Sequence, residues 1–182
     1  MLNPPEGNTG YTLLELMVTV TIAGILMGVA VPSFTSIIDS NRLTTYANDL
    51  VTALNYARSE AIKRNLRVSL CKSINSVSCT TINNWSQGWV IFTDQNNNST
   101  YDNSTETLLR VQTYKANTTT MVGETSVANY ISYIATGQSQ LSTGAFQAGT
   151  IKICDERTGN VGINIALNST GRVSTQKNIT CP

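Results

Sequence analysis

The chain begins with a long apolar run and then changes to a one-sided pattern. After the polar residues 1–10, no charged side chain occurs from Leu16 to Ile38. As an α-helix, this 23-residue run extends about 35 Å, enough to cross the hydrocarbon core of a bilayer. From Leu43 to Ala61 apolar residues recur every three or four positions. This spacing predicts that the helix continues, now amphipathic, to about Asn65.

Beyond Asn65 the pattern changes to short β-type runs, many of them bounded by Gly, Asn or Ser. The predicted strands are Val68–Cys71, Gly88–Thr93, Thr107–Tyr114, Tyr130–Ala135, Thr150–Cys154 and Gly162–Leu167. The expected fold class is therefore α+β, with a long N-terminal helix packed on an antiparallel β-sheet domain.

Composition argues against an enzyme. Among the 182 residues there is no histidine, so a Ser-His-Asp triad, a Cys-His pair or a His-ligated metal centre cannot form. The net charge of +1 does not by itself indicate any class of binding partner. Charged residues make up only 13% of the chain, and Asn, Thr and Ser supply most of its polarity. That mixture is typical of a secreted or surface-displayed domain.

Four cysteines, at positions 71, 79, 154 and 181, lack the CxxC spacing of zinc sites. Their even number favours two disulfides and an oxidising compartment, with four buried free thiols as the alternative. Of the three possible connectivities, Cys71–Cys79 with Cys154–Cys181 is favoured because each pair closes the shorter loop.

Glu15 stands just before the uncharged run, within the first turn and a half of the predicted helix. A carboxylate at bilayer depth costs a few kcal/mol unless it lies near the interface or is paired. The segment is also unlike an ordinary secretory signal, since no basic residue precedes it and the glycine comes before the apolar run. Glu15 is therefore a candidate functional residue.

The residues Gly10-Tyr11-Thr12-Leu13-Leu14-Glu15-Leu16 resemble the leader junction of type IV pilins and type II secretion pseudopilins. In that family a dedicated prepilin peptidase cuts after the glycine and methylates the new N-terminus. The resemblance implies cleavage between Gly10 and Tyr11, although the family usually has Phe at that position and this leader lacks Lys and Arg. It also implies that Glu15 pairs with the Tyr11 amine of a neighbouring subunit in a filament, fixing register.

Three later blocks are similar to minor pseudopilins of the GspH/FimT type. They are Ala57-Arg58-Ser59-Glu60-Ala61-Ile62, then Trp85 with Gly88-Trp89-Val90-Ile91-Phe92, and Gly171-Arg172-Val173. The resemblance implies a leader at 1–10, a membrane and filament helix at 11–38 and a periplasmic domain at 39–182. It implies a minor pilin that initiates, joins or caps a type IV pilus together with other pilins. The alternatives are a type II secretion pseudopilin and a DNA-binding minor pilin of an uptake pilus.

The DNA-binding alternative depends on basic residues. One basic group surrounds the helix end (Arg58, Lys63, Arg64, Arg67 and Lys72), and four more basic residues lie between 150 and 182. The FimT branch uses a Gly-Arg-x-Arg motif, whereas this chain has Ser174 in place of the second arginine. Arg172 and Lys177 are the candidate contacts for double-stranded DNA.

A polar stretch from Asp94 to Glu106 spaces its oxygen-bearing side chains as a calcium loop does. In an EF-hand register, however, the sixth position is Ser99 instead of glycine and the twelfth is Thr105 instead of glutamate. A solvated surface loop is the interpretation favoured here, and no metal or cofactor is expected.

Overall fold

The computed structural model describes residues 10–182 except 83 and 115–117, and the side chains of 29 and 31–33 also lie outside the description. The leader expected over residues 1–10 therefore lies outside the described residues apart from Gly10. The chain forms two units, one up to Asp39 and one from Ser40 onward. Each unit is described by itself below.

In the first unit the dominant element is helix α1 (Leu13–Arg64), which continues into the second unit. Thr12 caps its start: the Thr12 side-chain oxygen accepts a hydrogen bond from the Glu15 backbone N–H at 3.2 Å. Thr12 and Glu15 thus occupy the two key positions of a capping box, whose acid also lies at the positive end of the helix dipole.

No helix within the part of the chain that the structure describes is both long enough and apolar enough to cross a membrane. The membrane-spanning role expected for residues 11–38 stays a prediction.

In the second unit the strands form two four-stranded antiparallel sheets. The first has the order β3-β2-β1-β5, made of Leu108–Thr113, Gly88–Thr93, Val68–Lys72 and Tyr130–Tyr133. The second has the order β4-β6-β7-β8, made of Thr120–Gly123, Gly149–Cys154, Gly159–Leu167 and Val173–Cys181. Single 3-10 turns lie at Trp85–Gln87 and Thr125–Val127.

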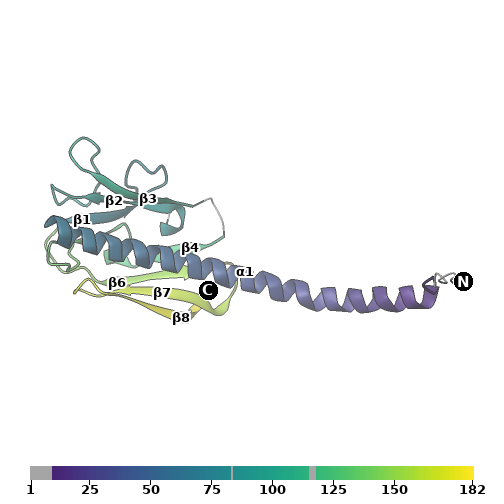
Figure 1. Ribbon diagram of the computed structural model, residues 1–182. Helices are drawn as coiled ribbons and strands as arrows, with labels where there is room; N and C mark the ends of the chain where they lie inside the picture. Colours follow the sequence, from purple (N-terminus) through teal and green to yellow (C-terminus); the bar gives the residue numbers. More distant parts are fainter. Residues whose placement is uncertain (1–9, 83, 115–117) are drawn as a thin grey trace, which may run out of the picture. The chain divides into compact units, whose positions relative to one another are not determined.

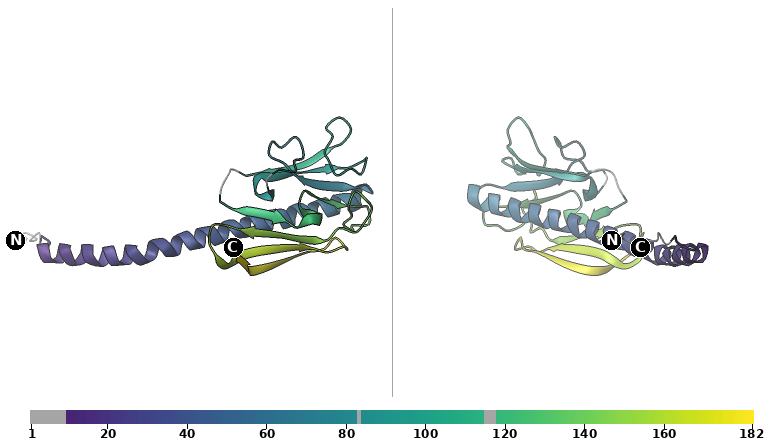
Figure 2. Two further views of the ribbon diagram at one scale, coloured as in Figure 1. Left: turned by 180° about the vertical axis from the view of Figure 1, so that it is seen from behind. Right: turned by 45° about the vertical axis from the view of Figure 1, so that its right-hand side comes forward.

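Within this unit α1 runs between β1–β3 on one side and β6–β8 on the other (Figures 1 and 2). Its apolar stripe from Leu43 to Ala61 is buried against residues of both sheets in one core. Trp85 and Trp89 are buried in the same core, and the Trp85 indole N–H donates to the Val127 carbonyl at 3.0 Å. Both tryptophans therefore serve packing, as large buried aromatic side chains usually do.

Near the end of α1, Arg58 donates hydrogen bonds to turns next to a strand of each sheet. Its Nε donates to the Gly137 carbonyl at 2.9 Å, in the turn after β5, and its Nη2 donates to the Thr170 carbonyl at 3.2 Å, in the turn before β8. Gly171 has a φ of +78°, and a Cβ there would lie 2.1 Å from the Gly137 carbonyl oxygen. Arg58 of the Ala57–Ile62 block and Gly171 of the Gly171-Arg172-Val173 block, which are far apart in the sequence, therefore both contact Gly137.

The fold class is confirmed, since a long helix packs on antiparallel sheets, and α1 ends at Arg64, one residue before the predicted boundary. The expected single sheet, however, is divided into two. Strands β4 and β8 were also not predicted. Both are edge strands, and five consecutive residues of β8 are exposed, so neither carries the apolar alternation that marks a half-buried strand.

Two disulfides are present, Cys71–Cys79 and Cys154–Cys181, with Cα–Cα distances of 5.6 and 5.8 Å. This is the connectivity that the shorter-loop argument favoured. The second bridge joins the end of β6 to the end of β8. It therefore holds the C-terminal edge strand in the sheet.

Candidate functional site

The processing and assembly candidates lie together at the start of α1. Gly10 and Tyr11 precede the helix and are exposed, and Tyr11 has 87% of its surface accessible. A Cβ at Gly10 would contact nothing within 4 Å, and its φ is not in the left-handed region. The described fold therefore gives no reason for glycine at this position, unlike at Gly171.

Glu15 makes no ion pair with any residue that the structure describes. Its backbone is held by Thr12, while its side chain is free to meet a group from outside the unit. The capping-box spacing of Thr12 and Glu15 was readable in the sequence but was not recognised, and it places this acid at the positive end of the helix dipole.

The surface around Glu15 is apolar. From Tyr11 to Gly28, and again from Phe34 to Ile38, every side chain is exposed. Four of its large apolar side chains, those of Leu13, Leu14, Met17 and Phe34, expose more than 60% of their surface. A continuous apolar patch of this extent marks a surface that another apolar body covers.

The structure does not bring the two DNA-binding candidates together. Arg172 precedes β8 and Lys177 lies within it, five residues further along, which is about 16 Å for an extended strand. Lys177 lines a hollow beside Ser40 and Thr44 of α1, whereas Arg172 lines a separate hollow beside Asn168. Two isolated cations form a poor phosphate-binding surface, because affinity depends on many simultaneous contacts.

The basic group near the helix end is mostly engaged internally. Arg58 donates to the two turn carbonyls described above. Arg67 donates to Asn97, Ser132 and Gln140. Lys72 is buried, which lowers the pKa of its amine, and its Nζ donates to the Thr81 carbonyl at 3.2 Å. Lys63 and Arg64 both form ion pairs with Glu60.

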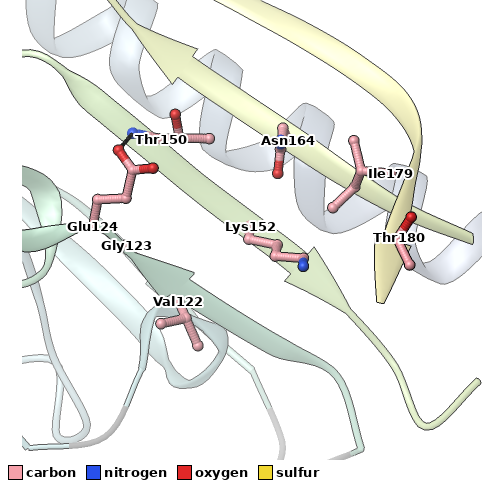
Figure 3. Close-up of a pocket in the computed structure, with 8 residues that line it drawn as sticks. All are labelled: Val122, Gly123, Glu124, Thr150, Lys152, Asn164, Ile179 and Thr180. Atoms are coloured by element: carbon pink, nitrogen blue, oxygen red, sulfur yellow. Dashed lines mark hydrogen bonds between the residues drawn. The ribbon is translucent and has the colours of Figure 1, made fainter. Parts of the chain in front are cut away.

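Of the remaining basic residues of the C-terminal region, Lys152 shares a hollow with an acid and Arg157 forms an ion pair with one. Lys152 lines a hollow of about 480 Å³ on the second sheet together with Glu124, whose carboxylate accepts from the Thr150 N–H at 2.9 Å (Figure 3). The Arg157 Nε donates to both carboxylate oxygens of Asp155, and its Nη2 donates to the Asp155 Oδ2 at 2.7 Å. The electrostatic case for nucleic acid is therefore weak on this face.

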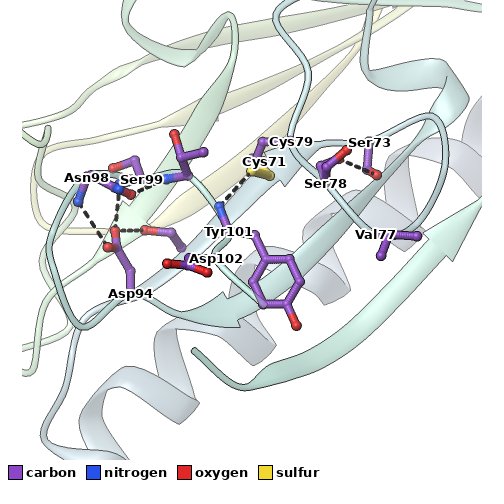
Figure 4. The surroundings of a disulfide bond; sticks show 12 residues. Cys71, Ser73, Val77, Ser78, Cys79, Asp94, Asn98, Ser99, Tyr101 and Asp102 are labelled. Atoms are coloured by element: carbon purple, nitrogen blue, oxygen red, sulfur yellow. Dashed lines mark hydrogen bonds between the residues drawn. A yellow bond between two sulfur atoms is a disulfide. The ribbon is translucent and has the colours of Figure 1, made fainter. Parts of the chain in front are cut away.

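The acidic loop after β2 is organised by its own backbone. Asp94 is buried and accepts from the Ser69 hydroxyl at 2.7 Å and from the backbone N–H groups of Asn98 and Ser99 (Figure 4). Glu106 is also buried and accepts from the N–H groups of Gln95 and Asp102. Burial, with the nearby Asp94 charge adding to it, raises the pKa of Glu106.

These carboxylates thus shape the loop by accepting N–H donors. Across the described residues, no three Cys, Asp or Glu side chains converge as metal ligands would.

A capped helix with an exposed apolar surface, followed by an α+β unit, defines a pilin-like subunit. Residues 7–31 match the prokaryotic N-terminal methylation motif, and residues 46–171 match the family described as type II transport protein GspH. The second match covers more than half of the chain, so the protein belongs to the GspH family of pilin-like proteins. Members of this family have structural roles, assemble with other pilins and are processed by a prepilin peptidase.

The pilin-like protein PilA1 of Thermus thermophilus is 37% identical over 95 residues. The match covers 51% of this chain and 53% of that protein, so the chain spans about half the length of this curated relative. Two crystal forms of the type IV minor pilin FimU of Pseudomonas aeruginosa superpose with TM-scores of 0.57 and 0.53, at 22% and 21% identity. They cover 78% and 75% of this chain and 93% and 94% of the FimU chains. These two similarities show the fold alone.

Proposed function

We propose that this protein is a minor pilin that inserts into a type IV pilus through the helix beginning at Leu13, and that it initiates or caps the filament. The observation that carries this proposal is the juxtaposition at the start of α1. Glu15, a carboxylate with no ion-pair partner among the described residues, stands at the head of a helix whose large apolar side chains are exposed. A filament core of similar helices covers such a surface, and a cationic N-terminus from a neighbouring subunit neutralises the acid.

Processing supplies that cation. In this proposal the peptidase cuts between Gly10 and Tyr11 and methylates the new amine, which keeps its positive charge. No described atom lies within 4 Å of a Cβ added at Gly10, which supports a glycine required by the peptidase and not by the fold. Mass spectrometry of the protein from sheared filaments is expected to show residues 1–10 removed. A protein that still carries them contradicts the proposal.

Before assembly, the proposed location is the inner membrane, with residues 39–182 in the periplasm. The uncharged run from Leu16 to Ile38 supports the insertion, and the two disulfides support an oxidising compartment for the globular part. Labelling of cells with a membrane-impermeant reagent, after opening of the outer membrane, tests this orientation on the full chain.

Substitution of Glu15 separates its two roles. Glu15→Gln keeps the side-chain shape and the capping-box chemistry, which glutamine also supplies, but removes the charge. Incorporation into filaments, measured by immunoblot of sheared pili, is expected to fall at least tenfold because the buried amine then lacks a counter-charge. Membrane levels of the protein are expected to stay unchanged.

Glu15→Asp is the matched variant, since it keeps the charge on a shorter side chain and is expected to restore part of the incorporation. Glu156→Gln, at an exposed acid of the second unit, controls for loss of charge elsewhere. Normal incorporation of Glu15→Gln refutes the pairing role.

A type II secretion pseudopilin is the second candidate, and the match to the GspH family over residues 46–171 favours it. The two candidates differ in which system fails without the protein. Deletion is expected to abolish surface pili if the chain is a pilus subunit, and to block export of a secreted enzyme while leaving pili intact if it is a pseudopilin.

A further inference from the structure

A hollow of about 230 Å³ lies at the start of the second unit, where α1 passes the last two strands. Residues of α1, β7 and β8 line it, and its polar members are Ser40, Thr44, Asn160, Lys177 and Asn178. Among the described residues of this lining, Lys177 alone carries a charge. The hollow is therefore locally cationic, with hydroxyl and amide groups around one ammonium.

Lys177 lies on the helix-facing side of the second sheet. It is paired across the strands with Ile163, a buried residue of the core, and directly opposed residues share one face of a sheet. Because β8 is an edge strand, the Lys177 side chain is nevertheless exposed. It forms no hydrogen bond or ion pair with any residue that the structure describes. Its ammonium is thus accessible to a ligand that enters the hollow.

The backbone of β8 is irregular directly beside Lys177. The register shifts between Gly162 and Ile163 of β7, which leaves Asn178 as an extra residue of β8. Asn178 has a φ of +60°, in the left-handed region that few residues other than glycine adopt. Bulges of this kind re-aim side chains and are frequent beside binding sites. The exposed Asn178 amide makes no hydrogen bond with a described residue, so it remains available to a ligand.

Two further groups complete the polar rim of the hollow. The Asn160 Oδ1 accepts from the Thr180 hydroxyl at 2.8 Å, which leaves the Asn160 NH2 group as a donor. The Arg157 Nη1 donates to the Ser40 hydroxyl at 3.0 Å, while its Nη2 pairs with Asp155. That ion pair adds no net charge, so Lys177 determines the charge of the hollow. One ammonium with amide donors around it suits a phosphate group, which only accepts hydrogen bonds.

The position of the hollow along the chain indicates where such a phosphate comes from. The uncharged run ends at Ile38, and Ser40 and Thr44 follow it on the same helix. By the rise of the helix, both lie within about 10 Å of the end of the run. The headgroup layer on each side of a bilayer is roughly 5–8 Å thick. Insertion of the run therefore brings the hollow to the depth of the lipid headgroups.

We infer that this hollow binds the headgroup phosphate of an anionic phospholipid, with Lys177 as the counter-charge and the amides of Asn160 and Asn178 as donors. The inference rests on the membrane insertion proposed above. Phosphatidylglycerol carries one net negative charge, whereas the choline of phosphatidylcholine cancels its phosphate, so charge complementarity favours the anionic lipid. The contact holds the second unit to the bilayer surface until the subunit leaves for a filament.

The test is a competition between two lipids for the whole protein, purified from membranes in a non-ionic detergent. Phosphatidylglycerol and phosphatidylcholine with the same acyl chains are added in equal amounts, and the bound lipids are counted by native mass spectrometry. Bound phosphatidylglycerol is expected to exceed phosphatidylcholine about fivefold, the usual effect of one cation beside an anionic lipid.

Lys177→Gln is expected to abolish the preference for phosphatidylglycerol. Lys152→Gln is the matched control, because it removes the same charge from a lysine that lines a different hollow, and it is expected to keep the preference. Asn178→Gly keeps the left-handed backbone and removes only the amide, so it is expected to lower bound phosphatidylglycerol about threefold, the effect of one lost hydrogen bond.

The inference is overturned if wild type binds the two lipids equally, or if Lys177→Gln keeps the same preference as Lys152→Gln. In that second case the Lys177 charge serves only to protect the edge of β8 from pairing. Displacement of phosphatidylglycerol by millimolar inorganic phosphate, but not by sodium chloride of equal ionic strength, overturns the lipid assignment in favour of a soluble phosphate.

Membrane insertion is checked separately by carbonate extraction, in which wild type and Lys177→Gln are both expected to stay in the membrane. Release of wild type contradicts the proposed insertion and, with it, the depth of the hollow. Retention of wild type without a lipid preference contradicts the lipid site alone.

Discussion

The two units of the chain use their side chains in opposite ways. Up to Asp39, large apolar residues are exposed and Glu15 has no ion-pair partner in the described part of the chain. From Ser40 onward, polar residues are buried or half-buried and engaged: Asp94, Arg67 and Asp155 each make several internal hydrogen bonds. The polar side chains of the second unit thus find their partners within the fold, whereas the exposed apolar side chains of the first unit need another molecule to cover them.

This contrast gives a way to separate stability from assembly. A substitution in the second unit is expected to change the free energy of unfolding, and a substitution in the first is expected to change incorporation into filaments. Trp85 and Trp89 are buried in the second unit, so their fluorescence reports unfolding of that unit in the full chain.

Gly171→Ala is expected to have the largest effect on stability. The new Cβ would lie 2.1 Å from the Gly137 carbonyl oxygen, and the φ of +78° disfavours any side chain. The backbone must move, so we expect a loss of about 4 kcal/mol in the free energy of unfolding, measured by denaturant titration of the tryptophan fluorescence.

Gly144→Ala is the matched control for this prediction, because Gly144 has a φ of +89° but nothing lies within 4 Å of a Cβ there. It carries only the conformational penalty of about 1 kcal/mol. Equal losses for the two variants would mean that the contact with Gly137 has no energetic role.

Removal of the disulfides is expected to rank next. Cys154–Cys181 spans 27 residues and Cys71–Cys79 spans 8. The loop-entropy relation gives about 3.5 kcal/mol for the longer and about 2.5 kcal/mol for the shorter. Paired Cys→Ala variants, compared by denaturant titration, check the order. A larger loss for the 71–79 pair would show that native contacts around the shorter loop outweigh chain entropy.

Lowering the pH is expected to destabilise the second unit through protonation of Asp155. Burial would raise the pKa of this carboxyl, but the hydrogen bonds and charge of Arg157 outweigh it, so the pKa lies below the usual value of 3.8. The unfolded state then binds the proton more readily. The stability due to this pair is present above about pH 4 and is lost as pH falls through the folded pKa.

In Asp155→Asn, the deficit in unfolding free energy relative to wild type is therefore expected to be about 1–3 kcal/mol at neutral pH and to shrink below pH 4. Glu106 has the opposite sign: its raised pKa gives stability at low pH that is lost as pH rises through the folded value. A deficit in Asp155→Asn that is independent of pH contradicts the role of the Arg157 pair.

The central part of the fold could be predicted from the sequence because burial leaves a pattern. The stripe from Leu43 to Ala61 has helical spacing, and β2 reads as a continuous apolar run, buried throughout. Strands β4 and β8 could not be predicted in the same way, since edge positions place polar side chains in solvent and need no alternation. The division into two sheets depends on contacts between residues far apart in the sequence.

The residues of the candidate site also divide into those that could be predicted from the sequence and those that could not. Glu15 and the glycine before Tyr11 were readable, because a lone acid and a glycine that matches the methylation motif stand out against an apolar run. The internal use of Arg58 and Arg67 was not, since a basic residue in the sequence looks the same whether it faces solvent or a buried carbonyl.

The smallest expected effect on stability tests the contrast directly. Met17→Ser replaces a side chain that is 62% exposed in the first unit, so it removes no burial and is expected to change the free energy of unfolding by less than about 0.5 kcal/mol. Leu50→Ser, at a fully buried position on the same helix, is the matched control and is expected to cost about 3 kcal/mol or more.

If Met17→Ser destabilised the second unit, whose unfolding the tryptophans report, as much as Leu50→Ser does, the exposed helix would be packing on that unit in solution. Its apolar surface would then not be available for a filament partner. A neutral effect on unfolding together with reduced incorporation into sheared filaments is the result that places its contribution between subunits.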